Sequence, residues 1–418
     1  MGTYTNYFEK KTYNIFCEED FVSELKNVIG EFRSFAEALD SFICQHGYDG
    51  DLEDVEAKVR FVFDKHTQSG VPAPRNLKKW YTERKRIKRN SKVPFQFCFA
   101  FGLNVEETND FLHKVCLERG IDCHLAEECV YYYAFKNGLT YSEAADIVKR
   151  LNPVKPKKIE VTELVYTELI EEKIDGLETV DELVDYLNEN ESKFAYNNVT
   201  ACETIQMLWN EIAGSKMEKG IARKEREQGY ILFNKEVDAQ RIYEAKTGRK
   251  ERKRDRDSIW EIYLQILGLS GNYVADCYKN RSLKSVLKDN DLVHPLAEDA
   301  FPDRDGLNKV IHGVHVSYER IRKLMILLTF YKFYASRMID QGGEMYGESP
   351  EDGDRCISYI NSNLTMANYM SLYPGNPYDF LILMAIRSEQ PLNIFREYMR
   401  ELYFSKIDID ALYQGWEE

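Results

Sequence analysis

The stretch that decides the fold, residues 21–47, reads FVSELKNVIGEFRSFAEALDSFICQHG. Its apolar side chains recur at spacings of three and four, from Phe21 through Phe32 to Ile43, and Gly47 follows the last of them. This period is that of an α-helix whose apolar stripe faces a core. We therefore expect one long amphipathic helix here, ending near Gly47.

The same period continues along most of the chain, and no convincing series of alternating strand residues interrupts it. Residue types that begin helices stand at Asn104, at Thr140 and in the stretch TVDE at 179–182, while Gly120 and Gly138 are placed to end them. Further helices are expected over residues 52–66, 75–84, 93–101, 105–118, 125–136 and 141–151. The sequence predicts an all-α, multi-helical fold.

A second decisive segment is NPYDFLILMAI at residues 376–386. Asn376 has the residue type of an N-cap, Pro377 suits the first helical position, and Asp379 suits the positive end of the helix dipole. The residues that follow are apolar on every side of the helix, so we expect this segment at the centre of a core.

Composition narrows the class of protein. Of the 418 residues, 44% are hydrophobic and 30% are charged, which is ordinary for a globular chain. No apolar run approaches the ~20 residues of a membrane span, and the opening residues MGTYTNYFEKK lack an apolar secretion core. The nine cysteines have no framework spacing and suit a reducing compartment. We expect a cytoplasmic protein without membrane contact.

Two stretches read as linkers. PVKPKK at 153–158 places two prolines among lysines, and residues 216–256 mix fourteen bases with eight acids. We therefore divide the chain into an N-terminal helical domain (1–152), an acidic helical connector (153–215), a mixed-charge linker (216–257) and a C-terminal helical domain (258–418).

One short stretch opposes the charge of the whole chain. Residues 75–92, RNLKKWYTERKRIKRNSK, carry nine bases and one acid, although the formal net charge of the chain is -14. Because the acidic remainder of the chain repels nucleic acid, any nucleic acid would have to bind locally and in one orientation.

Residues 74–111 resemble the second half of a lambda-repressor-like helix-turn-helix domain. The matching parts are a short recognition helix at 76–81, a turn at 82–90, Pro94 in an apolar helix, and the sequence FGLNVEE at 101–107. The preceding residues depart from that family, since 54–66 lack its Q-x-x-L-A pattern and are more aromatic. The resemblance covers about a tenth of the chain and implies a DNA-binding unit in the N-terminal domain.

On a helix that starts near Arg75, the residues Leu77, Trp80 and Tyr81 would face inward, and the polar ones would face outward. Exposed side chains near the start of a recognition helix reach base edges, and flanking bases hold phosphates. The expected contact residues are Arg75, Asn76, Lys78, Lys79, Thr82, Arg84, Lys85, Arg86, Lys88 and Arg89. The alternative is a solvated loop, or a patch held against the acidic body of the same chain.

Longer parts of the chain resemble a group of helical proteins from gut Clostridia and related Firmicutes, often carried near mobile elements. The resembling segments are 97–103, 131–144, 197–201 and 373–379. This resemblance implies class and source, and it implies no mechanism.

Evidence for catalysis is thin. Arg60 and His66 match the R-x4-6-H pattern of HEPN-type ribonucleases, in which an Arg and a His flank a scissile phosphate. About one such match is expected by chance in a chain of this composition. Phosphate-binding P-loops, nucleophile elbows, H-E-x-x-H zinc helices and glycine-rich dinucleotide turns do not occur.

A crowded set of metal-type residues lies at His113, Cys116, Cys123, His124 and Cys129. Its spacing lacks the paired C-x2-C knuckles of zinc sites, and free cysteines are common core residues. We expect no metal and no other cofactor.

These patterns favour a DNA-binding regulatory protein of a mobile element or phage-related locus. Double-stranded DNA would bind at residues 75–92, and the C-terminal domain would form a homodimer or bind a protein partner. One alternative is a protein-interaction factor in phage–host conflict, either a defence component or an inhibitor that mimics nucleic acid. A further alternative is a helical HEPN-like ribonuclease.

Overall fold

The computed structural model describes residues 3–13, 28, 31–83, 87, 92–152, 167–191, 194, 199–215, 217–228, 257–268, 304–312, 318–341, 350–367 and 369–404. Every regular element in these ranges is a helix, and none of them contains a strand. The expected all-α, multi-helical fold is therefore confirmed.

The chain forms two compact units. Unit 1 contains residues 1–32, 201–364 and 371–418, and unit 2 contains residues 33–200 and 365–370. The predicted linker at 153–158 lies outside the described residues, as does most of the predicted linker at 216–257.

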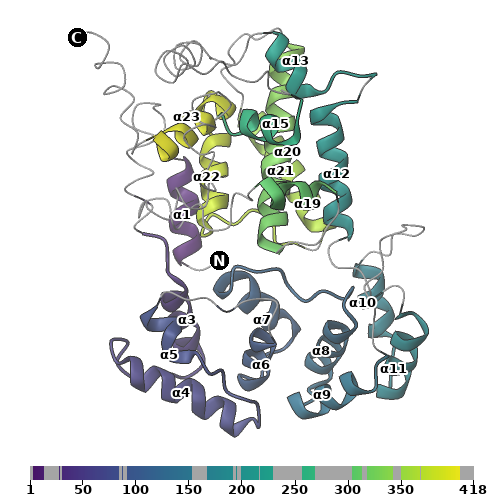
Figure 1. Cartoon of the computed structure of the whole chain (residues 1–418). Coiled ribbons are helices and arrows are strands. Elements are labelled where there is room, and N and C mark those ends of the chain that lie inside the picture. The colour runs from purple at the N-terminus through teal and green to yellow at the C-terminus, as the bar shows by residue number, and fades with distance from the viewer. Residues whose placement is uncertain are drawn as a thin grey trace, which may run out of the picture. The chain divides into compact units, whose positions relative to one another are not determined.

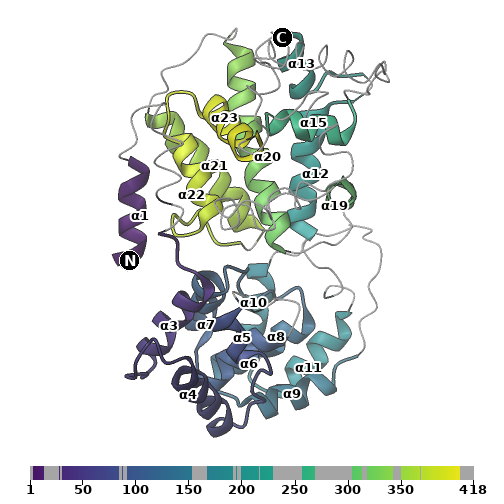
Figure 2. The ribbon, with the colours of Figure 1, turned by 60° about the vertical axis from the view of Figure 1, so that its left-hand side comes forward.

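Unit 2 is a bundle of short helices (Figures 1 and 2). In chain order they are α3 (Phe35–Gln45), α4 (Val55–Gln68), α5 (Leu77–Thr82), α6 (Val93–Ala100), α7 (Val105–Asp110), the π-helix η1 (Phe111–Val115), α8 (Ala126–Asn137), α9 (Tyr141–Lys149), α10 (Thr167–Asp175) and α11 (Val180–Glu189). Its core is rich in stacked aromatic rings. The ring centroid of Phe97, on α6, lies 4.7 Å from that of Phe101 and 4.9 Å from that of Phe111. Helix α6 therefore contributes a central ring to this core.

Most of the expected helix ends are confirmed in unit 2. Asn104, Thr140 and Thr179 each cap a helix through a reciprocal capping box with the glutamate three residues later. Gly138 ends α8 in the left-handed conformation. These ends depend on neighbouring residues alone, which is why the sequence predicts them.

The expected helix over 105–118 is interrupted, and Gly120 does not end it. After α7 the backbone widens into η1, and the amide of Glu118 bonds to the carbonyl of Leu112 at 2.8 Å. Leu117 then takes a φ of 53°, which turns the chain out of the helix before Gly120 is reached. The prediction failed because π-helical turns occur as short insertions within α-helices, and the apolar spacing of 105–118 does not reveal one.

The expectation of one continuous helix from Phe21 to near Gly47 is wrong, because the chain leaves the helix at residues 31–34 and only α3 follows. Residues 31–34 form a turn, and Ser34 begins α3 with a capping box to Glu37. Phe32 belongs to unit 1, where it stacks on Phe8 at 4.5 Å, whereas Phe35 belongs to the core of unit 2. The apolar spacing runs on because both sides of the break are buried, each in its own unit. Residues 14–27 lie outside the described residues.

The longest described helices belong to unit 1 (Figure 1). They are α1 (Thr3–Tyr13), α12 (Val199–Ala213), α13 (Ile221–Glu227), α15 (Ile259–Ile266), α19 (Arg304–Ile311), α20 (Tyr318–Asp340), α21 (Pro350–Met366), α22 (Pro377–Ile386) and α23 (Pro391–Phe404). All ten residues of α22 are buried, and the Asn376 side chain accepts hydrogen bonds from the amides of Tyr378 and Asp379. The expected central helix and its cap are confirmed.

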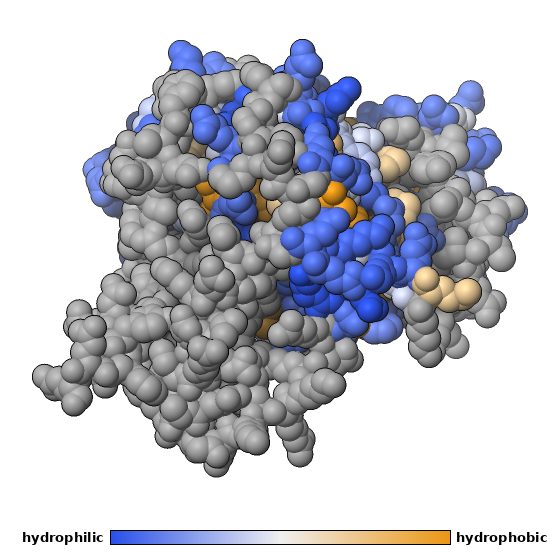
Figure 3. Space-filling view, turned by 90° about the horizontal axis from the view of Figure 1, so that it is seen from above, coloured by the Kyte–Doolittle hydropathy of each residue, from blue (hydrophilic) through white to orange (hydrophobic). Residues whose placement is uncertain are grey.

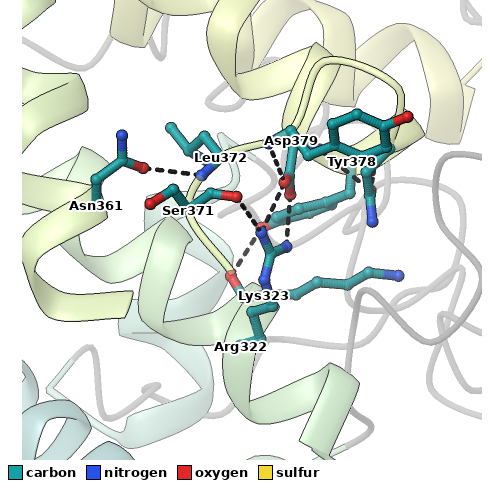
Figure 4. A network of polar contacts seen from close by, with 9 residues as sticks. Arg322, Lys323, Asn361, Ser371, Leu372, Tyr378 and Asp379 are labelled. Atoms are coloured by element: carbon teal, nitrogen blue, oxygen red, sulfur yellow. Dashed lines mark hydrogen bonds and ion pairs between the residues drawn. The ribbon is translucent and has the colours of Figure 1, made fainter. Parts of the chain in front are cut away.

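Two buried ion pairs join the helices of unit 1. Arg322 of α20 donates two hydrogen bonds of 2.7 Å to Asp379 of α22, and a third, of 3.3 Å, to the carbonyl of Ser371 (Figure 4). Arg396 of α23 donates a bond of 2.6 Å to Glu225 of α13. Buried charges are stable only when they are paired and hydrogen-bonded in this way.

The Glu225 carboxylate also accepts hydrogen bonds from two other helices. Tyr331 of α20 donates its hydroxyl to it at 2.7 Å, and Gln265 of α15 donates its amide at 2.8 Å. Four helices that are distant in sequence therefore meet at one carboxylate.

On the face drawn in Figure 3 the described side chains are mainly hydrophilic, with small hydrophobic areas between them, as on an ordinary protein surface. In the described part of the chain, no helix has both the length and the apolar composition needed to cross a bilayer.

Candidate nucleic-acid interface

The basic stretch begins with α5, a six-residue helix that packs against α3 and α4. Leu77 and Trp80 are each only 4% exposed, and Ile87 beyond the helix is also 4% exposed. The Trp80 ring lies edge-on to Phe35 at 5.8 Å. A helix this short is not stable alone, so these apolar contacts hold it in place.

The opposite side of α5 is open. Arg75, Asn76, Lys78, Lys79 and Thr82 are all exposed. The expected division is thus confirmed for Leu77 and Trp80 and for the five outward residues, whereas Tyr81, expected inward, is half-buried. Whether those residues bind DNA remains a prediction. The other five expected contact residues lie outside the described residues: Arg84, Lys85, Arg86, Lys88 and Arg89.

Asn76 occupies the N-cap position of α5, with φ −110° and ψ 17°. Its side chain makes no capping hydrogen bond, so the amide is not used to start the helix. Thr82, by contrast, donates its hydroxyl to the carbonyl of Lys78 at 3.0 Å. Asn76 is therefore the better placed of the two to bond a ligand.

The lysines of the stretch pair with carboxylates on the surface of unit 2. The ammonium of Lys78 lies 2.8 Å from Glu56, and that of Lys92 lies 2.6 Å from Glu127. The hydrogen bond with Glu56 raises the pKa of Lys78, which is therefore protonated at neutral pH. Because such exposed pairs contribute little stability, a phosphate could replace the carboxylate at small cost.

Lys79 has a looser pair on its own helix, with 3.7 Å between its ammonium and Glu83. The described interface is therefore a mixed surface, in which each lysine has a nearby carboxylate. Lys78 and Lys92 pair with carboxylates outside the stretch, whereas Glu83 belongs to it, and the alternative of a patch held against the acidic body stays a prediction.

Two features of the expected helix-turn-helix segment are present after α5. Pro94 is buried at the start of α6, and Asn104 begins α7 directly after buried Leu103. Most of the expected turn at 82–90 lies outside the described residues. These features fit the resemblance, and the family itself stays a prediction.

Arg60 and His66, the residues of the ribonuclease hypothesis, do not share a surface. Both lie on α4, where Arg60 is exposed and His66 is fully buried against Phe97. The Nδ1 atom of His66 lies 3.1 Å from the carbonyl oxygen of Pro72, and burial lowers the pKa of His66 to about 4. An enclosed, neutral histidine is poorly placed to transfer a proton to a bound RNA.

The described residues of the zinc hypothesis do not form a common ligand set. Cys116, Cys123 and Cys129 are buried, and the Cys129 thiol donates to the Cys123 carbonyl at 3.0 Å. The hydrogen bond with Cys129, together with burial, raises the pKa of Cys123, which keeps it a thiol. In the ranges that the structure describes, no three potential ligands gather closely enough to hold a metal ion.

Asp122, which the sequence did not single out, is the charged centre of this loop. It is fully buried, forms an ion pair with Arg119, and lies 3.0 Å from the Nδ1 atom of His124. Burial raises the pKa of its carboxyl, but the stronger combined effect of Arg119 and His124 holds it well below its usual range. The sequence did offer a signal for this buried charge. Arg119, Asp122 and Glu128 are charged residues within three positions of cysteines, a residue type that is commonly buried.

Comparisons with protein-family models, with curated proteins and with solved structures gave no match. The geometry of α5 is therefore the basis for a function.

Proposed function

We propose that this chain is a DNA-binding regulatory protein of a mobile element or phage-related locus, and that α5 contacts double-stranded DNA. The observation that supports the proposal is the sidedness of α5. Its apolar residues are buried in unit 2, while Arg75, Asn76, Lys78 and Lys79 are exposed together at its start. An exposed helix start that carries Asn and basic residues is what major-groove recognition requires.

The chemistry assigns different roles to these residues. Asn76 would pair with adenine, and Lys79 would reach a base edge. Arg75 and Lys78 would hold phosphates, together with the lysines and arginines of residues 84–92. The acidic remainder of the chain would repel the duplex elsewhere, so binding would be restricted to this edge.

A binding titration with duplex DNA over a range of salt concentrations tests the proposal. Lys78→Ala is expected to weaken binding to every duplex and to lower the log–log salt slope by about one. The triple change of Arg84, Arg86 and Arg89 to Ala should lower the slope by about one for each lost phosphate contact. Asn76→Ala should instead change sequence preference.

Lys149→Ala is the matched control. Lys149 of α9 forms an exposed ion pair of 2.7 Å with Asp146, similar to the 2.8 Å pair of Lys78 and Glu56. Equal losses from the two variants would mean general attraction to positive charge and would contradict a role for α5.

A second candidate is a protein-interaction factor in phage–host conflict. It is favoured by the carboxylates that neutralise Lys78, Lys79 and Lys92, since a mixed surface suits a protein partner as well as a phosphate backbone. Capture of a basic nucleoprotein from the host, lost on Glu56→Lys and retained without nucleic acid, would support this function over DNA binding.

A further inference from the structure

A buried lysine lies beneath the exposed face of α5. Lys58 of α4 is only 4% exposed, and its ammonium lies 2.9 Å from an oxygen of Asp40 on α3. The same ammonium lies 4.4 Å from the ring centroid of Tyr81 on α5. One charge on α4 thus contacts two other helices of unit 2, α3 and α5.

The charge is poorly suited to stabilisation alone. A buried ammonium loses its hydration, and one ion pair rarely compensates for that loss better than an apolar side chain would. The second oxygen of Asp40, Oδ1, is buried and has no hydrogen-bond partner among the described residues. Burial accordingly raises the pKa of Asp40. The arrangement does restrain the orientation of the Tyr81 ring, because a cation attracts the face of an aromatic ring.

Leu77 and Trp80 decide which side of α5 faces the core, and no side chain caps the helix start. A directional contact at Tyr81 restrains the rotation of the helix further. Lys79 and Tyr81 are two residues apart and therefore about 200° apart around the helix. Holding the Tyr81 ring inward keeps Lys79 outward.

We propose that Lys58 is the positioning residue of α5: its ammonium, held by Asp40, fixes the Tyr81 ring and with it the rotation of the helix about its axis. This inference rests on the proposed function only for its consequence in DNA binding. The positioning itself is a property of unit 2.

Three variants test it. Lys58→Met removes the charge and keeps the volume, and Tyr81→Leu removes the ring. Tyr81→Phe is the matched control, because it keeps the ring and removes a hydroxyl that is buried without a described partner. We expect Lys58→Met and Tyr81→Leu each to weaken duplex binding about tenfold, and Tyr81→Phe to leave it within about twofold.

The salt slope separates positioning from direct contact. Lys58 is buried and would not touch phosphate, so the slope should be unchanged in Lys58→Met. A slope lowered by about one would show direct phosphate contact and would overturn the inference. The double variant should bind no more weakly than either single variant, since both remove the same interaction.

Hydrogen exchange of the α5 amides gives a readout that needs no DNA. Lys58→Met and Tyr81→Leu should speed exchange at residues 77–83 and leave α8 and α9 unchanged, whereas Tyr81→Phe should match the wild type. If the wild type binds no DNA, the proposed function fails and the exchange data still decide the positioning. Wild-type exchange in both variants would overturn it, and if Lys58→Met does not fold, the two Tyr81 variants decide alone.

Discussion

Charge is used differently in two regions of this molecule. Around Glu225 in unit 1, Arg396, Tyr331 and Gln265 surround a carboxylate that water does not reach. Around α5 in unit 2, the Lys78–Glu56 pair is largely exposed to solvent. The first arrangement cannot exchange partners without disturbing the core, whereas the second can. Charges available to a ligand are therefore expected at α5 and not at Glu225.

Breaking the Glu225 pair should have the largest effect on stability. Arg396→Met leaves a buried carboxylate without its cation and should lower the free energy of unfolding by about 3–5 kcal/mol. Adding Glu225→Leu should restore part of the loss, because most of the cost is the unpaired charge. Denaturant titration of the three proteins measures this. A loss below about 1 kcal/mol in Arg396→Met would mean that water reaches the pair, and the contrast with α5 would disappear.

The two regions also differ in how far the sequence predicts them. The exposed side of α5 follows from helical spacing, because Leu77 and Trp80 must face the core together. The partners do not follow, since Glu56 is 22 residues from Lys78 and Glu225 is 171 residues from Arg396. Asp379 was predicted from its place at a helix start, and its pairing with Arg322, 57 residues away, was not.

The ends of the helices differ in the same way in how far nearby residues predict them. The caps at Asn104 and Thr140 depend on residues three positions apart and were predicted. The turn at 31–34 was missed, because the apolar spacing continues across it into a different unit. Spacing reports that a side chain is buried and does not report which core buries it.

The second prediction concerns His66, whose burial should keep its imidazole neutral. Its folded pKa is lowered to about 4 from 6.5, so the unfolded chain binds the proton first as pH falls. The stabilising effect of a neutral His66 is therefore complete above pH 6.5 and is lost down to about pH 4, amounting to about 3 kcal/mol at about 1.4 kcal/mol per pKa unit.

Unfolding of wild type and His66→Gln across this range measures the effect. The variant should lose less stability than the wild type between pH 6.5 and 4, because glutamine does not titrate. Parallel curves would mean that His66 becomes protonated inside the fold, and its buried site would then tolerate charge as the Glu225 region does.

The third prediction sharpens the contrast through backbone geometry. Gly268 has φ +70°, and a Cβ there would lie 2.6 Å from Cβ and Cγ of Arg396. Gly138 has a similar φ of +65°, and a Cβ there would meet nothing within 4 Å. Gly138→Ala should therefore cost about 1 kcal/mol, from conformation alone, and Gly268→Ala about 2 kcal/mol or more, because it also displaces Arg396. Equal melting-temperature losses would show that Arg396 has room to move.

The smallest effect is expected from Glu56→Gln, which tests the surface side of the comparison. Both members of the Lys78–Glu56 pair are more than half exposed, so unfolding free energy should change by less than about 0.5 kcal/mol. If α5 meets phosphate, the same change removes a carboxylate that competes with DNA for Lys78. Duplex affinity should then rise a few-fold at low salt, and the gain should fade as salt screens exposed charges. Asp146→Gln, beside Lys149, is the control and should change neither quantity.

Because Glu56→Gln leaves every lysine and arginine in place, a gain in duplex affinity confined to this variant would locate the phosphate contact at Lys78. A loss of affinity would instead indicate that Glu56 holds Lys78 in its binding position, and the pair would then resemble the fixed one at Glu225 more than an exchangeable surface contact.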